Sequence, residues 1–263
     1  MGVRWHLAES SRIARKQRGV PKARLLAYLI LRRGFYWLLL RLAVPISSAV
    51  SLLGRSMASI KEECASRNID CLFHFTPIEH LDSILNHGLL VPSACAKLGT
   101  GMTPNDAVRH DGQDAICLSV EWPNYKLFYS FRQRDTSRQW ALIAVQHRVL
   151  WEKRVCFNTT NAADNSMSAQ SFAARTGLAK FQELFGDCCG KVRSDLNLAD
   201  HLPTNPQAEV LCLDTIEPAY FYGVFLGDSA AYNAYKSKYP DIEFMKDLGY
   251  FSYRTNWGHW KNG

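Results

Sequence analysis

The sequence predicts an α+β fold, and three observations point to it. Short apolar segments typical of strands are mixed with amphipathic segments typical of helices, without the regular alternation of a doubly wound sheet. The sequence contains neither an internal repeat nor a low-complexity tract. Apolar residues make up 47% of its 263 residues. This content is sufficient for a large core and excludes fibrous and fully disordered classes.

The first 60 residues differ from the rest in charge. Residues 1–61 contain twelve Lys and Arg but one acidic residue, a balance of +11, whereas the remaining residues sum to −4. Arg32, Arg33 and Arg41 interrupt the apolar stretch within this part, and a membrane span needs about 20 nearly uncharged residues. We expect a basic and apolar extension over 1–60 and a folded domain over 61–263. The extension is either helical and in contact with a membrane, nucleic acid or partner, or poorly ordered.

The eight cysteines are irregularly spaced, and none belongs to a Cys-x-x-Cys motif. Zinc ribbons, zinc fingers and thioredoxin-like redox sites need such ligand pairs, so the sequence predicts no metal site of these kinds. Several cysteines lie in apolar runs, where a reduced and buried thiol is expected. This pattern favours a cytoplasmic protein.

The strand–helix unit that begins at residue 71 has the clearest local signals. Residues 71–75 form an apolar run, and residues 76–79 read Thr-Pro-Ile-Glu, the pattern of a capping box with proline at the first helical position. Apolar residues then recur at helical spacing up to Gly88, which is expected to end the helix.

Further elements follow from the same two periodicities. Strands are expected at 115–120, 140–145, 155–157, 207–213 and 219–226, and helices at 169–185 and 229–238. A turn at 122–125 leads into an aromatic and basic segment at 126–134, and a polar loop occupies 186–206.

Three residues stand out as candidates for chemistry, because the sequence lacks Rossmann, P-loop, HExxH and GxSxG motifs. Glu209 shares one face of a predicted strand with Leu211 and Leu213, and burying a carboxylate there is costly unless it is paired or used. The alternative is a Glu at a strand end that reaches solvent or an arginine. His74 can equally be an ordinary polar-face histidine, and Arg109 an ordinary solvated loop charge.

A resemblance to a known family favours functional roles for these three residues over the ordinary structural ones. The motif Phe-His-Phe-Thr at 73–76, followed by His-Gly-Leu-Leu at 87–90, resembles the opening motif of the DarT family of nucleic-acid ADP-ribosyltransferases. Residues 109–126 are similar to the middle of some members, and Asn-Pro-Gln-Ala-Glu-Val-Leu at 205–211 resembles the motif that contains the family's catalytic glutamate. The resemblance runs in order from 71 to 226, about 60% of the chain.

The resemblance implies a split β-sheet core with flanking helices and a reaction that needs no metal. The family cleaves the nicotinamide–ribose bond of NAD⁺ and transfers ADP-ribose to a base in single-stranded DNA. Glu209 would stabilise the positive charge of the oxocarbenium-like state and accept the proton from the base. Arg109 would clamp the diphosphate and act in catalysis. His74 would hold the nicotinamide end, with Thr76 and Ser83 as further cofactor contacts.

The resemblance is less specific about the residues that bind the nucleic acid. Tyr125, Phe128 and Arg132 are expected to stack on bases or contact phosphates, and the alternative for the aromatic residues is a place in the core. Asn197 and His201 are expected to read the base from the loop at 186–206. The segment 128–134 reads FYSFRQR, where thymidine-modifying members carry a pattern close to FYFxPRSPM. Base preference therefore stays open, and Arg132 is a rival to Arg109 for the family's arginine.

The resemblance also implies a toxin or phage-defence effector with a macrodomain antitoxin as its partner. The alternatives are the same chemistry on RNA or on guanine, and a non-catalytic nucleic-acid-binding module with this fold. A related RNA 2′-phosphotransferase is disfavoured because its set of phosphate-binding residues is not matched. A membrane-attached enzyme that modifies proteins would depend on residues 1–60 alone.

Overall fold

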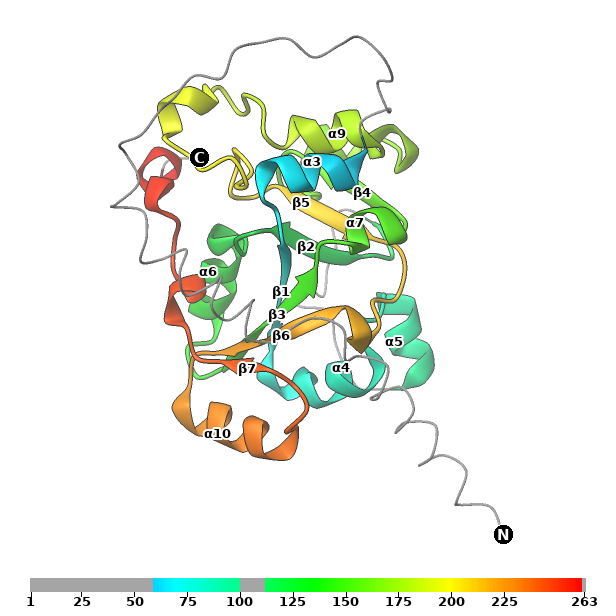
Figure 1. Cartoon of the computed structure of the whole chain (residues 1–263), viewed down its shortest axis with the longest axis vertical. Coiled ribbons are helices and arrows are strands. Elements are labelled where there is room, and N and C mark those ends of the chain that lie inside the picture. The colour runs from blue at the N-terminus through cyan, green and yellow to red at the C-terminus, as the bar shows by residue number, and fades with distance from the viewer. Residues whose placement is uncertain (1–58, 100–111, 262–263) are drawn as a thin grey trace, which may run out of the picture. The chain divides into compact units, whose positions relative to one another are not determined.

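The computed structural model describes residues 59–99 and 112–261. The predicted extension, apart from its last two residues, and Arg109 lie outside these ranges. The described part contains a seven-stranded sheet of order β4-β5-β2-β1-β3-β6-β7 (Figure 1). In chain order the strands are β1 (Cys71–Pro77), β2 (Ile116–Val120), β3 (Trp140–Gln146), β4 (Val155–Asn158), β5 (Glu209–Cys212), β6 (Phe221–Leu226) and β7 (Phe244–Met245).

The sheet divides between β1 and β2. β1 pairs with β3 from Cys71 to Pro77, but it pairs with β2 only through Leu72 and Phe73. β2 pairs with β5 from Ile116 to Leu118, and β5 in turn pairs with β4. Beyond Phe73 the sheet therefore separates into a β1-β3-β6-β7 part and a β2-β5-β4 part. This confirms the expected α+β fold with a split sheet and flanking helices.

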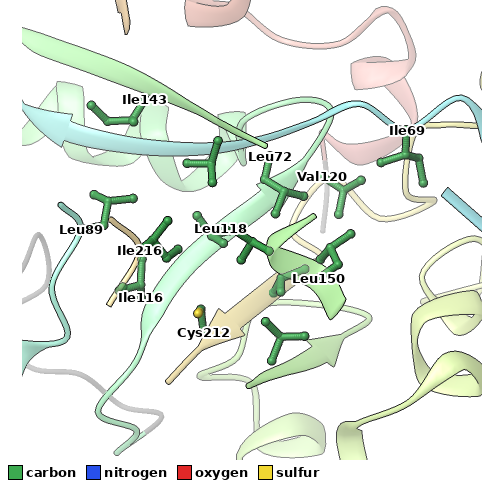
Figure 2. Close-up of a cluster of buried hydrophobic side chains, with 14 of the residues drawn as sticks. Ile69, Leu72, Leu89, Ile116, Leu118, Val120, Ile143, Leu150, Cys212 and Ile216 are labelled. Atoms are coloured by element: carbon green, nitrogen blue, oxygen red, sulfur yellow. The ribbon is translucent and has the colours of Figure 1, made fainter. Parts of the chain in front are cut away.

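One face of the sheet carries the main apolar core. Leu72, Leu118 and Ile143, from β1, β2 and β3, are buried there and belong to one apolar cluster, part of which Figure 2 shows. The helices that cover this face are α3 (Ile60–Arg67), α4 (Leu81–His87), α7 (Val149–Glu152) and α9 (Leu178–Glu183). At about 25 cal/mol per Å² of buried apolar surface, such a core is the main source of stability.

Aromatic side chains cover the other face. α6 (Tyr125–Arg134) packs here, with the Phe75 and Phe128 ring centroids 4.9 Å apart. The C-terminal 3-10 turns η5 (Leu248–Phe251) and η6 (Thr255–Trp260) continue this layer, and Tyr250 lies 4.8 Å from Phe73 between centroids. The residues that the structure describes also form α5 (Pro92–Leu98), α8 (Asn165–Ser168) and α10 (Ser229–Lys238).

The capping box predicted at 76–79 does not form. Thr76 and Pro77 extend β1, where they pair with Ala141 and Trp140 of β3. A 3-10 turn at Ile78–His80 follows, and α4 begins after it without a side-chain cap. The strand pairing thus takes precedence over the local cap. Gly88 does end α4, with a φ of 87°, as predicted.

The helix predicted at 169–185 is wrong in its extent. The segment contains only the turn η2 (Ala173–Arg175) and the short helix α9. Gly177, with a φ of 90°, separates them, a conformation that glycine adopts readily. Arg175 turns its side chain into the interior instead of continuing a surface helix.

The other predicted elements are present with small shifts of their ends. The strand predicted at 207–213 is shorter and begins at Glu209, and the one predicted at 219–226 begins at Phe221 after a 3-10 turn. The helix at 229–238 has the predicted bounds. β7 was not predicted; it pairs parallel to β6 over two residues.

Candidate active site

Glu209 begins β5 at the divided part of the sheet and is buried, with 5% of its surface exposed. Its Oε2 accepts a hydrogen bond of 2.8 Å from the backbone N–H of Ala162, and its Oε1 accepts one of 3.4 Å from Asn124 Nδ2. Both partners are donors, so they stabilise the ionised carboxylate. Leu211 lies in a small apolar cluster with Ala162, and Leu213 packs against it, as the predicted alternation requires.

Asn124 connects this carboxylate to the start of α6. Its Oδ1 accepts the Leu127 N–H and caps the helix, while its own backbone N–H donates to Ser119 Oγ on β2. Only the Nδ2 group is left to face Glu209. The same amide therefore starts a helix and orients the carboxylate, and it is itself buried.

A second buried amide holds the backbone of Glu209. Asn158 lies opposite Glu209 in the β4–β5 pair, and its Nδ2 donates to the Glu209 carbonyl oxygen over 3.2 Å. Its Oδ1 accepts from the guanidinium of Arg175, which is 1% exposed. A buried arginine needs such acceptors, because an unpaired buried charge is costly. Arg175, Asn158 and Glu209 thus form one connected network.

His74 is the first residue of β1 beyond the point where β1 and β2 separate. Its Nδ1 lies 2.9 Å from the carbonyl oxygen of Cys117 on β2. Since a carbonyl can only accept, Nδ1 carries a proton and donates it to Cys117. The imidazole therefore connects the two parts of the sheet. Thr76, two residues further along β1, is buried.

The loop that precedes Glu209 is held by two arginines. Arg193 donates to the carbonyl oxygens of Ala199 and Leu202 and to Thr204 Oγ1, each at 2.9–3.0 Å. Arg254, from the C-terminal segment, donates to the carbonyls of Pro203 and Thr204 at 2.8 and 3.1 Å. Burial lowers the pKa of Arg254 to about 10, yet the group stays charged near neutral pH.

The residues predicted to bind the nucleic acid differ from one another in their exposure to solvent. Tyr125 and Phe128 are buried core side chains of α6, which leaves Tyr129, 58% exposed, as the surface aromatic of that helix. Arg132 donates to the Phe251 carbonyl at 2.8 Å. Asn197 is exposed and His201 half-buried, both in the loop before Glu209.

Ser83 and Glu209 lie on different elements, α4 and β5. α4 packs on the main core face, and the Ser83 hydroxyl lies 3.4 Å from His87 Nδ1 one turn away. Arg109, predicted to clamp the diphosphate, falls outside the described residues. The structure therefore leaves these roles as predictions.

Sequence reasoning missed several site residues, namely Asn124, Asn158, Arg175 and Arg254. A signal existed for Asn158, a polar residue at the end of an apolar strand, and for Asn124, which precedes a helix as caps do. Nothing local singles out Arg175 or Arg254. Their role depends on contacts across 17 and about 50 residues.

Among the described residues, His, Cys, Asp and Glu side chains form no cluster of three or more that could bind a metal ion. Within the same ranges the structure contains no helix long and apolar enough to cross a membrane.

Comparison with known families shows the family of the chain. Residues 73–248, about two thirds of the chain, match the family model of DarT, described as an ssDNA thymidine ADP-ribosyltransferase. The chain belongs to the DarT family. As a DarT it is an NAD⁺-dependent ADP-ribosyltransferase by class, and the Glu209 network lies within the matched residues.

Two solved DarT structures are similar to the chain. Thermosipho africanus DarTG in complex with ADP-ribose is 16% identical, with a TM-score of 0.46, over 69% of this chain and 50% of that one. The chain thus spans half the length of that protein. Thermus sp. 2.9 DarT in complex with NAD⁺ is 12% identical, with a TM-score of 0.42, over 69% of this chain and 97% of that one. Comparison with curated proteins gave no match.

Proposed function

We propose that this DarT transfers ADP-ribose from NAD⁺ to a base in single-stranded DNA and releases nicotinamide, with Glu209 as the catalytic carboxylate. The observation that supports this most is the arrangement of Glu209. It is a buried carboxylate whose oxygens accept hydrogen bonds from Asn124 and Ala162 and whose backbone carbonyl accepts one from Asn158. Burying a carboxylate is costly unless it is paired or used, and these donors hold this one in a fixed orientation.

The chemistry follows from the charge that develops on the ribose. Breaking the C1′–nitrogen bond sends its electron pair to nicotinamide, which leaves as a neutral pyridine, and the ribose becomes oxocarbenium-like. The anionic Glu209 stabilises this positive charge. A nitrogen of the base then forms the new bond to C1′, and its proton passes to Glu209 and from there to solvent.

Cofactor binding is assigned to the divided part of the sheet. The Cys117 carbonyl accepts from His74 Nδ1, which orients the ring for contact with the nicotinamide end. Thr76 and Ser83 are further predicted contacts, and Arg109 is the predicted clamp on the diphosphate because a guanidinium matches phosphate oxygens in pairs.

The nucleic acid is read by the loop at 186–206 and by α6. Asn197 and His201 lie in that loop, which Arg193 and Arg254 hold in place immediately before Glu209. On α6, the exposed ring of Tyr129 takes the stacking role first predicted for Tyr125 and Phe128, since both of these are in the core. Arg132 already donates to Phe251, so a phosphate would have to share its guanidinium.

The biological role follows from the family resemblance alone. A DNA base modified with ADP-ribose blocks base pairing, so we propose a toxin or phage-defence effector, acting in the cytoplasm. Its partner would be a macrodomain antitoxin that removes the modification.

The test uses short single-stranded DNA and RNA oligomers that differ in one base. Each is incubated with NAD⁺ and the enzyme, and its mass is measured. We expect one ADP-ribose to be added to a single DNA class. Addition to RNA would replace the proposed substrate by the alternative, addition to guanine alone would select guanine as the base, and unchanged oligomers and NAD⁺ would reject the proposal.

A further inference from the structure

Cys188 and Cys189 form an adjacent pair of thiols in the loop before Glu209. Their Sγ atoms are 3.1 Å apart, and Cys189 is exposed while Cys188 is half-buried. The other six cysteines are reduced too; four are buried and two half-buried, and each lies at a different position of the fold. A contact this close between two thiols, one of them open to solvent, distinguishes the pair.

The surroundings tie this pair to the candidate site. Asn205 Nδ2 points to both sulfurs, at 3.4 Å from Cys189 and 4.0 Å from Cys188. Cys188 Sγ donates to the carbonyl oxygen of Thr159 over 3.5 Å. Thr159 follows Asn158, the residue that holds the backbone of Glu209. The thiol pair therefore joins the loop to the end of β4.

We propose that Cys188 and Cys189 are a redox modification site, which a small disulfide oxidant such as glutathione disulfide converts to a disulfide between neighbouring residues. The exposed Cys189, as a thiolate, attacks one sulfur of the oxidant and releases the first thiol. Cys188 then attacks the Cys189 sulfur and releases the second. The two protein thiols lose two electrons, the oxidant gains them, and the two protons leave on the released thiols.

The order of these two steps follows from the environment of each sulfur. Burial, and then the neighbouring Cys189, raise the pKa of Cys188 to about 12, so its thiolate is scarce near neutral pH. Since the thiolate is the nucleophile, the exposed Cys189 reacts first. Cys188 reacts second because its sulfur is already in contact with the Cys189 sulfur that forms the mixed disulfide.

The oxidised pair is expected to be easily reduced again. Neighbouring Cα atoms are about 3.8 Å apart, below the usual separation of about 4.4 Å or more between disulfide-bonded residues. A disulfide formed under such strain has an oxidising potential and belongs to the labile, regulatory kind. The modification is therefore reversible by a dithiol reductant.

Oxidation also affects the site. A disulfide has no S–H group, so the hydrogen bond from Cys188 to Thr159 is lost next to Asn158. This consequence rests on the proposed function: we expect transfer to slow roughly two- to tenfold, the worth of one hydrogen bond.

The full chain is incubated with glutathione disulfide, and the protein thiols that remain reduced are then blocked. The protein is digested with trypsin without reduction. Residues 181–191, FQELFGDCCGK, lie between two lysine cleavage sites and contain both sulfurs. We expect this peptide to lose the mass of two hydrogen atoms, and dithiothreitol to restore it. Cys95→Ser, a control at another half-buried thiol, keeps the change, whereas Cys189→Ser abolishes it.

An unchanged peptide, or one that carries only glutathione, overturns the proposal. The activity measurement is separate from this result. If the peptide is oxidised and transfer is as fast as in the reduced enzyme, the link to Glu209 is wrong. If the reduced enzyme transfers nothing, the proposed function fails while the redox site stands.

Discussion

Asn124 Nδ2 donates to Glu209 Oε1 over 3.4 Å, although the two residues are 85 positions apart in the chain. The contact connects the cap of α6 to the first residue of β5, across β2, whose Ser119 hydroxyl holds the Asn124 backbone. The orientation of the carboxylate thus depends on the position of a helix.

Asn124→Ser separates the two roles of this residue. Serine caps helices about as well as asparagine, whereas it cannot extend an amide donor to Glu209. We expect kcat for transfer to fall roughly ten- to a hundredfold, the worth of a hydrogen bond to a charged group. Asn124→Ala should lose a comparable amount of kcat and about 1 kcal/mol more of the free energy of unfolding. Equal activity of Asn124→Ser and the unmodified enzyme would show that this amide does not orient Glu209.

Arg254→Met should loosen the loop before Glu209. The substitution removes the two donors to Pro203 and Thr204 but retains most of the buried volume. We expect faster amide hydrogen exchange at 199–206 and a several-fold rise in KM for the oligomer, since a loop with fewer fixed contacts opens more often. Arg154→Met is the matched control, because Arg154 pairs with Asp214 at the surface. Unchanged exchange in Arg254→Met would show that Arg193 alone holds the loop.

Gly88→Ala tests the turn that ends α4. A Cβ at this position would collide with the carbonyl oxygen of Ile216, whose partner in an isolated bridge is Leu89. Gly99 also has a positive φ, of 63°, but a Cβ there would meet nothing within 4 Å. We expect Gly99→Ala to cost about 1 kcal/mol of unfolding free energy and Gly88→Ala about 3 kcal/mol. Denaturant unfolding measures both, and equal losses would mean that the collision is relieved by a small backbone shift.

Much of the fold could be predicted from the sequence, because its signals are local. The apolar runs of β1, β2 and β3 and the helix α10 follow the periodicities that the residues show. The local signals failed where distant contacts override them. Thr76 and Pro77 satisfy the rules for a helix start, but pairing with β3 keeps them in the strand. In the predicted helix at 169–185, Gly177 and the inward-facing Arg175 interrupt the helical pattern.

The candidate site was predictable only in part. Glu209 was identified because a carboxylate on an apolar strand face is unusual, and its contacts agree with that reasoning. The residues that orient it come from α6, β4 and a turn, and no spacing in the sequence connects them. Tyr125 and Phe128 were predicted to stack on bases or, alternatively, to belong to the core, and both are buried, Phe128 against Phe75 and Trp140.

The most direct test of the account is the comparison of Glu209→Gln with the unmodified enzyme. The substitution preserves size, although one of the two donors to the carboxylate loses its acceptor, so folding is checked by thermal unfolding. NAD⁺ should still raise the midpoint of that unfolding, since binding to the folded state stabilises it. Transfer to single-stranded DNA, followed by mass in a single turnover, should fall by roughly a thousandfold or more. Transfer within tenfold of the unmodified enzyme would contradict the assignment of Glu209 as the catalytic carboxylate.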